Sequence, residues 1–173
     1  MGRTRRGRAL ALLSAMVLAS GLLVACGSGS EEGSDQFRDQ TKDPLLDFGE
    51  EGSGAELSQG EEVVRAFLAA RGAGNWSRAC AQLSREMLDK IEHLAVSSTN
   101  LGDKSCPSFL GTFIRLSAKE RKETKVEAGG SLRRQGRNGY LIYYGNGEVV
   151  YAMPLGREGD AWKVASLSPQ RLG

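Results

Sequence analysis

Histidine is almost absent from this chain of 173 residues, which contains His93 alone. A histidine-based metal site needs several convergent ligands, and one imidazole cannot supply them. His93 also has no serine or cysteine beside it in a recognisable nucleophile motif, as a catalytic triad would require. No Cys-x-x-Cys or His–Cys spacing indicates redox chemistry. The sequence therefore predicts a protein that is not an enzyme and that has no catalytic residues, cofactor or metal.

A strong charge of one sign is also missing, since the formal net charge is +2. Residues 58–173 hold 17 basic and 12 acidic residues, and these charges are scattered along the chain. Such a mild excess does not indicate a nucleic-acid partner. The tightest basic groups are Lys119–Lys122 with Lys125, and Arg133 and Arg134 with Arg137. They are interpreted as a solvated helix end and a hairpin tip. The alternative for them is attraction to an anionic membrane or wall polymer.

Long hydrophobic runs are absent except near the N-terminus, where four arginines are followed by 17 residues without a charge. This pattern is typical of an export signal peptide, here residues 1–25. The motif Leu23, Val24, Ala25 and Cys26 resembles the lipobox of bacterial lipoproteins. The resemblance implies cleavage before Cys26 and attachment of a diacylglyceryl group, with acyl chains such as palmitate, to its thiol. We therefore expect a lipid-anchored protein on the extracytoplasmic face of the cell membrane; a transmembrane helix is the alternative.

Large apolar side chains are scarce in residues 26–57, which are rich in glycine and serine. Nine acidic residues oppose two basic ones over 27–57. Such a segment cannot bury enough surface to offset the entropy of ordering it. The sequence therefore predicts a disordered linker up to residue 57 and one folded domain over 58–173. Within the linker, Pro44–Phe48 is the only apolar cluster, and a docking motif for a partner is the alternative interpretation.

The first half of the predicted domain has helical periodicity. Ser58 and Glu61 have the spacing of a capping box and predict a helix over 59–71. Further helix starts are predicted at Asn75, Ser84 and Pro107. The apolar stripe predicted for the third helix consists of Met87, Leu88, Ile91, Leu94 and Ala95.

The second half alternates between apolar and polar residues, as strands do. The predicted strands are Val126–Arg134, Tyr140–Tyr144, Val149–Leu155 and Trp162–Val164. Gly129 and Gly130 interrupt the first of them and indicate a bulge or a sharp bend. Because the connections are short, the strands should form an antiparallel sheet with helices packed on one face. The expected fold class is therefore α+β.

Three segments carry a resemblance to a known fold. They are Val63–Leu68, the turn Gly72–Trp76 that leads into the helix of Cys80, and Asp160–Val164. They are similar to the nuclear transport factor two-like, or cystatin-like, cone of ketosteroid isomerase-type proteins, and to small exported lipoproteins of actinobacteria. The resemblance implies N-terminal helices packed on a curved, cone-shaped antiparallel sheet. It specifies no chemistry, because folds of this shape host enzymes, ligand carriers and interaction modules.

Because the residues offer little support for catalysis, we expect a non-catalytic domain that binds an unidentified small molecule or protein. The side chains expected to line its pocket are Tyr140, Ile142, Tyr144, Tyr151, Met153 and Trp162. A ketosteroid isomerase-like enzyme is the first alternative, and it would place a carboxylate base and a tyrosine inside the cone. The acids of the sheet, Glu127 and Glu148, lie near a bulge and a turn and do not match that base. A structural envelope protein is the second alternative.

Cysteine is scarce, with three residues in the chain, and the lipid would use Cys26. In an oxidising compartment the remaining pair, Cys80 and Cys106, indicates a disulfide. Each lies on the apolar stripe of a predicted helix, so both thiols should face the core. Closing a loop of about 26 residues would stabilise the domain by roughly 3 kcal/mol. Two buried free thiols are the alternative.

Overall fold

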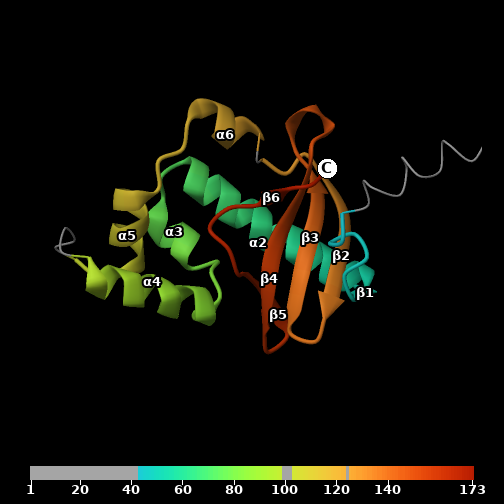
Figure 1. Ribbon diagram of the computed structural model, residues 1–173, viewed down its shortest axis with the longest axis horizontal. Coiled ribbons are helices and arrows are strands. Elements are labelled where there is room, and N and C mark those ends of the chain that lie inside the picture. Colours follow the sequence, from blue (N-terminus) through green and yellow to red (C-terminus); the bar gives the residue numbers. More distant parts are fainter. Residues whose placement is uncertain (1–42, 99–102, 124) are drawn as a thin grey trace, which may run out of the picture.

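The computed structural model describes residues 43–98, 103–123 and 125–173 (Figure 1). The helices are α2 (Gly54–Gly72), α3 (Trp76–Cys80), α4 (Arg85–Ser97), α5 (Cys106–Phe113), α6 (Ala118–Glu123) and the short 3-10 helix η2 (Asn146–Glu148). The strands are β1 (Glu50–Glu51), β2 (Ala128–Gln135), β3 (Asn138–Tyr144), β4 (Val150–Glu158), β5 (Ala161–Val164) and β6 (Gln170–Arg171). Helix α2 crosses one face of the sheet, and α3, α4 and α5 lie together beyond its edge (Figure 1). The predicted α+β class, with helices followed by an antiparallel sheet, is confirmed.

The folded chain begins earlier than the sequence predicts. Strand β1 pairs with β2, and the ring of Phe48 packs edge-on against Tyr140, with ring centroids 4.9 Å apart. The prediction of a disordered linker up to residue 57 is therefore wrong for residues 43–57, and so is the domain start at residue 58. Composition does not predict the order of residues 43–57, because the apolar surface on which they pack is supplied by the sheet. The signal peptide, Cys26 and the rest of the predicted linker lie outside the described residues.

Helix α2 begins at Gly54 rather than after Ser58. Its N-cap is Ser53, whose hydroxyl accepts a hydrogen bond from the backbone N–H of Glu56. The Glu56 carboxylate in turn accepts the Ser53 backbone N–H at 3.0 Å. Ser53 and Ser58 both have a glutamate three residues further on, so the pattern alone cannot choose between them. The fold selects Ser53, because Glu56 also pairs with Arg157 of β4 at 2.7 Å.

Helices α3, α4 and α5 begin where the sequence predicts. Asn75 and Ser84 accept hydrogen bonds from backbone N–H groups of the first turns of α3 and α4, and a proline occupies the first turn of α5. The predicted stripe of α4 is only partly buried. Ile91 and Ala95 are fully buried, but 54% of Leu94 is exposed. Helix α4 packs mainly on α5, so only part of its apolar face is covered.

The sheet is antiparallel throughout, with the order β1-β2-β3-β4-β5, and β6 pairs with the other half of β4. The predicted irregularity at the glycine pair is confirmed, because the register of β2 against β3 shifts between Gly129 and Ser131. Strands β1 and β6 were not predicted. Each has two residues, which is too short for an alternating pattern to be recognised.

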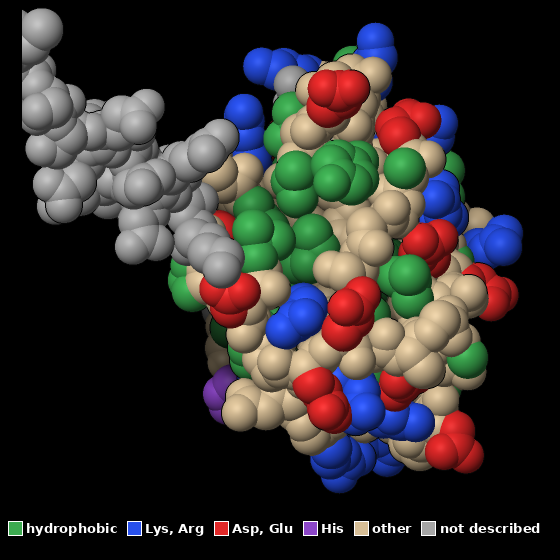
Figure 2. All heavy atoms as spheres, turned by 90° about the vertical axis from the view of Figure 1, so that its right-hand side faces the viewer, with side chains coloured by type: hydrophobic (Ala, Val, Ile, Leu, Met, Phe, Trp, Pro, Cys, Tyr) green, Lys and Arg blue, Asp and Glu red, His purple; other side chains and the backbone are tan. Residues whose placement is uncertain are grey.

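Both faces of the central strands are covered. The inner face packs against α2 and the neighbouring helices, and it carries Leu132, Leu141, Tyr143, Tyr151, Met153, Leu155, Trp162 and Val164. The outer face carries a smaller cluster of Ile142, Ala152 and Leu172, on which Leu45, Tyr140 and Val150 pack. Seen from the β1 side of the sheet, hydrophobic side chains gather next to the start of the described chain, and charged side chains interleave below them (Figure 2). The two ends of the folded chain therefore cover the outer face.

Candidate functional site

The six side chains predicted to line one pocket lie on two faces of the sheet. Tyr140, Ile142 and Tyr144 belong to β3 and point to the outer face. Those from β4 and β5 are Tyr151, Met153 and Trp162, and they are buried in the inner core. The register explains the split, because Ile142 lies opposite Ala152 and Tyr143 lies opposite Tyr151. A single pocket lined by all six residues is therefore wrong.

Arg71, at the C-terminal end of α2, is the one charged side chain that is buried among the described residues, with 3% of its surface exposed. Its guanidinium donates to the carbonyl of Leu167 and to the Ser168 hydroxyl, and lies 5.7 Å from the ring centre of Phe67. Burial lowers the pKa of the Arg71 guanidinium. Burial also raises the pKa of the Tyr143 hydroxyl above its ordinary value of 10.0. Arg71 thus ties the end of α2 to the C-terminal segment.

A hollow with an apolar lining lies between the C-terminal half of α2, Arg121 of α6 and residues 125–126 before β2. Its lining residues are Arg65, Leu68, Ala69, Gly72, Arg121, Lys125 and Val126, and its volume is about 350 Å³. We call it the basic groove. Leu68 and Val126 are buried and form an apolar floor. The Arg65 guanidinium donates to the carbonyl of Val126 at 2.6 Å, which fixes this cation to the start of β2.

A second hollow of about 230 Å³ adjoins the basic groove at Arg121. Its lining residues are Arg71, Trp76, Ile114, Arg115, Leu116 and Arg121. The Arg121 guanidinium donates to the carbonyls of Gly72 and Leu116, at 3.0 and 2.9 Å, and so stands between the two hollows. Cations from four parts of the chain therefore converge on one end of the molecule.

The sequence alone indicates only part of this arrangement. It shows the basic segment around α6 and predicts a solvated helix end there. Arg65 was missed as a partner of that segment. Its position offered a local signal, because Leu68 and Ala69 follow it at helical spacings of three and four residues and share its face. That this face meets α6 is decided by the fold alone.

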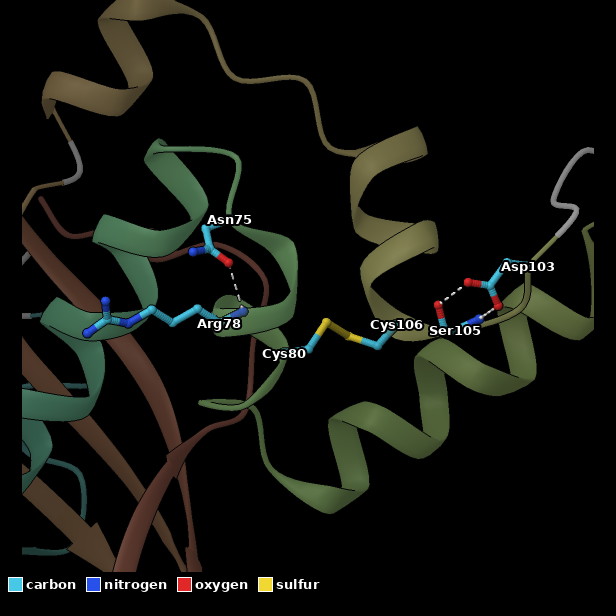
Figure 3. Close-up of a disulfide and its surroundings, with 6 residues drawn as sticks. All are labelled: Asn75, Arg78, Cys80, Asp103, Ser105 and Cys106. Carbon is cyan, nitrogen blue, oxygen red and sulfur yellow. Dashed lines mark hydrogen bonds between the residues drawn. A yellow bond between two sulfur atoms is a disulfide. The ribbon is translucent and has the colours of Figure 1, made fainter.

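The predicted disulfide is confirmed, because the structure joins Cys80 and Cys106 with their Cα atoms 6.2 Å apart. Figure 3 shows the bond linking α3 to the first turn of α5. The Asn75 side chain caps α3 nearby by accepting the backbone N–H of Arg78. Asp103 accepts two hydrogen bonds from Ser105 just before α5. Both cysteines are buried, as the helical stripes predict.

Other classes of site find no support in the described part of the chain. His93 is on the exposed side of α4. No cluster of three or more His, Cys, Asp or Glu side chains in the described ranges could hold a metal ion. None of the described helices combines the length and apolar content needed to cross a membrane. Comparisons with protein-family models, curated proteins and solved structures found no match to this chain.

Proposed function

We propose that this protein is an exported lipoprotein, anchored by Cys26 to the extracytoplasmic face of the cell membrane, whose domain binds a ligand without transforming it. The domain would be a nuclear transport factor two-like cone. The observation that carries the binding proposal is the basic groove, a hollow of about 350 Å³ with an apolar floor and a polar rim. Ligand pockets of roughly 300–1,000 Å³ with this composition are typical of small-molecule binding sites.

The anchor proposal is supported by the lipobox resemblance and is compatible with the start of the folded chain. Asp43, the first described residue, follows Cys26 by 17 residues. A chain of this length reaches at most about 60 Å when fully extended. The domain would therefore remain within one or two domain diameters of the bilayer surface.

The surroundings of the buried tyrosine favour binding over ketosteroid isomerase-like catalysis. Such an enzyme places a carboxylate base and a tyrosine together in a hydrophobic pocket. In the described residues, the charged group that lowers the pKa of Tyr143 against the effect of burial is the cation Arg71. The Tyr143 side chain itself is fully buried in the inner core.

The anchor is tested by intact-mass analysis of protein extracted from membranes. We expect a mature chain that begins at Cys26 and carries the mass of a diacylglyceryl group. Cys26→Ser should remain unprocessed and lack that mass, while Cys80→Ser, which also removes a thiol, should be processed normally. A mature wild-type chain that begins elsewhere, or that carries no lipid, would contradict the proposal.

A further inference from the structure

We propose that the basic groove binds an anionic amphiphile, that is, a carboxylate or phosphate headgroup carrying a short alkyl chain. This inference rests on the proposed ligand-binding function and names the chemical class of the ligand. It follows from the separation of apolar and cationic side chains within one hollow.

The floor of the groove suits an alkyl chain. Leu68 and Val126 are 7% and 3% exposed and present an apolar surface, and Ala69 extends it toward solvent. Burying an alkyl chain there contributes about 0.8 kcal/mol for each CH₂ that leaves water. A volume of about 350 Å³ lies at the small end of the range for ligand pockets, so a short chain fits better than a full phospholipid.

The rim of the groove suits an anion. Arg65, Arg121 and Lys125 surround the floor. Two hydrogen bonds hold the Arg121 guanidinium to backbone carbonyls, and a guanidinium has five N–H donors in all. An arginine held in this way can still offer paired donors to a carboxylate or a phosphate. The anionic headgroup would therefore lie at Arg121 with Lys125 beside it.

The sign of the charge distinguishes this region from the other hollows. The described lining residues of the basic groove and of the adjoining hollow include five cations, Arg65, Arg71, Arg115, Arg121 and Lys125, and no acid. Three further hollows in the described residues each include at least one Asp or Glu. Glu61 and Glu127 pair with Arg65 and Lys125 from outside the lining, and Glu120 interacts electrostatically with Arg71. The five cations outnumber these three described acids.

The test is equilibrium dialysis of labelled octanoate, octyl phosphate and octanol against the full chain in nanodiscs of zwitterionic phosphatidylcholine, with protein-free nanodiscs as the blank. We expect saturable binding of the two anions and at least tenfold weaker binding of the neutral alcohol. Lys125→Gln should weaken octanoate binding about threefold. The attraction between two exposed opposite charges is weak, and its loss changes the dissociation constant by a factor of this size. Ala69→Phe should abolish binding by filling the groove, while circular dichroism shows an unchanged fold.

The matched control is Lys90→Gln. Lys90 and Lys125 are both exposed lysines paired with a glutamate, at 2.7 and 3.3 Å, but Lys90 lies on α4, far along the chain from the groove. Its loss should leave octanoate binding unchanged. An equal loss of affinity in both variants would overturn the proposal, because it would indicate a general charge effect.

The remaining outcomes separate the two proposals. Octanol that binds as tightly as octanoate would overturn the anionic ligand and leave the ligand-binding function standing. Binding to phosphatidylglycerol vesicles without binding of octanoate or octyl phosphate would also overturn it, in favour of a membrane-docking surface. Octanoate that mass spectrometry recovers chemically changed would overturn the non-catalytic function itself.

Discussion

At the scale of single residues, Glu56 connects more of the fold than any local pattern indicates. Its carboxylate is 14% exposed and accepts hydrogen bonds from the Ser53 backbone and hydroxyl. It also pairs with Arg157 of β4 and with Arg134 of β2. The start of α2 is therefore held to two strands of the sheet through one acid.

We expect Glu56→Gln to destabilise the domain by on the order of 1 kcal/mol at pH 7, because charge-assisted bonds are lost. The hydrogen bond from the Ser53 backbone, with help from the Ser53 hydroxyl and the two arginines, holds the pKa of the Glu56 carboxyl below its ordinary value of 4.5. A lowered folded-state pKa means that this stabilisation is present above pH 4.5 and is lost as the pH falls through the folded-state value. The difference between wild type and variant in urea denaturation should therefore shrink below pH 4.5.

The control is Glu86→Gln, which removes an exposed carboxylate that pairs with Lys90 of the same helix, α4. It should change the free energy of unfolding less than Glu56→Gln does. Equal effects of the two variants, or a Glu56→Gln effect that does not depend on pH, would contradict the role assigned to Glu56.

At the scale of elements, the disulfide joins two short helices that could not persist alone. Helix α3 has five residues and α5 has eight, and isolated helices shorter than about 12 residues are marginal in water. The contact of α3 with α2, of α5 with α4, and of the two short helices with each other compensates for their length. The bond between Cys80 and Cys106 closes this contact covalently.

Reduction, or the double change Cys80→Ser with Cys106→Ser, should lower the free energy of unfolding by roughly 2–4 kcal/mol while secondary structure remains recognisable. Non-reducing peptide mapping of the oxidised protein should recover the linked pair, and denaturant titration measures the loss. Amide exchange should increase most in α3, α4 and α5. A free energy of unfolding that is unchanged by reduction would show that packing alone holds these helices.

At the scale of the whole molecule, residues near both ends of the described chain pack on the domain. The N-terminal segment contributes Leu45 and Phe48 to the outer face of the sheet, and Leu172 enters the same cluster from the C-terminal end. The outer face therefore depends on residues that composition alone assigns to a linker.

A chain that starts at Asp43 should be as stable as the full chain, whereas one that starts at Ser58 should be less stable by several kcal/mol. The shorter chain lacks the Ser53 cap, worth about 1 kcal/mol, and exposes apolar surface at about 25 cal/mol per Å². Thermal unfolding followed by circular dichroism compares the two. Similar thermal unfolding midpoints for the two chains would support a domain that starts at residue 58.

Local patterns were sufficient for several features of the fold. Helical spacing predicts α3 and α5 and the burial of Cys80 and Cys106. A helix with one apolar stripe is stable only with that stripe facing the core. Alternation identified the long strands for the same reason. The glycine pair in β2 signalled the irregularity that the register shows. These features depend on residues within about two helical turns, so the sequence carries them directly.

Other features depend on contacts between residues that are far apart in the chain. Two capping boxes, at Ser53 and at Ser58, could start α2. The helix starts after Ser53 because Glu56 forms ion pairs with arginines of β2 and β4. The predicted pocket was wrong because strand pairing, rather than residue type, assigns each side chain to a face. The basic groove forms because folding brings Arg65 of α2 close to Arg121 of α6. Local patterns indicate which way a side chain turns, whereas the partner that it meets is decided only when distant elements pack.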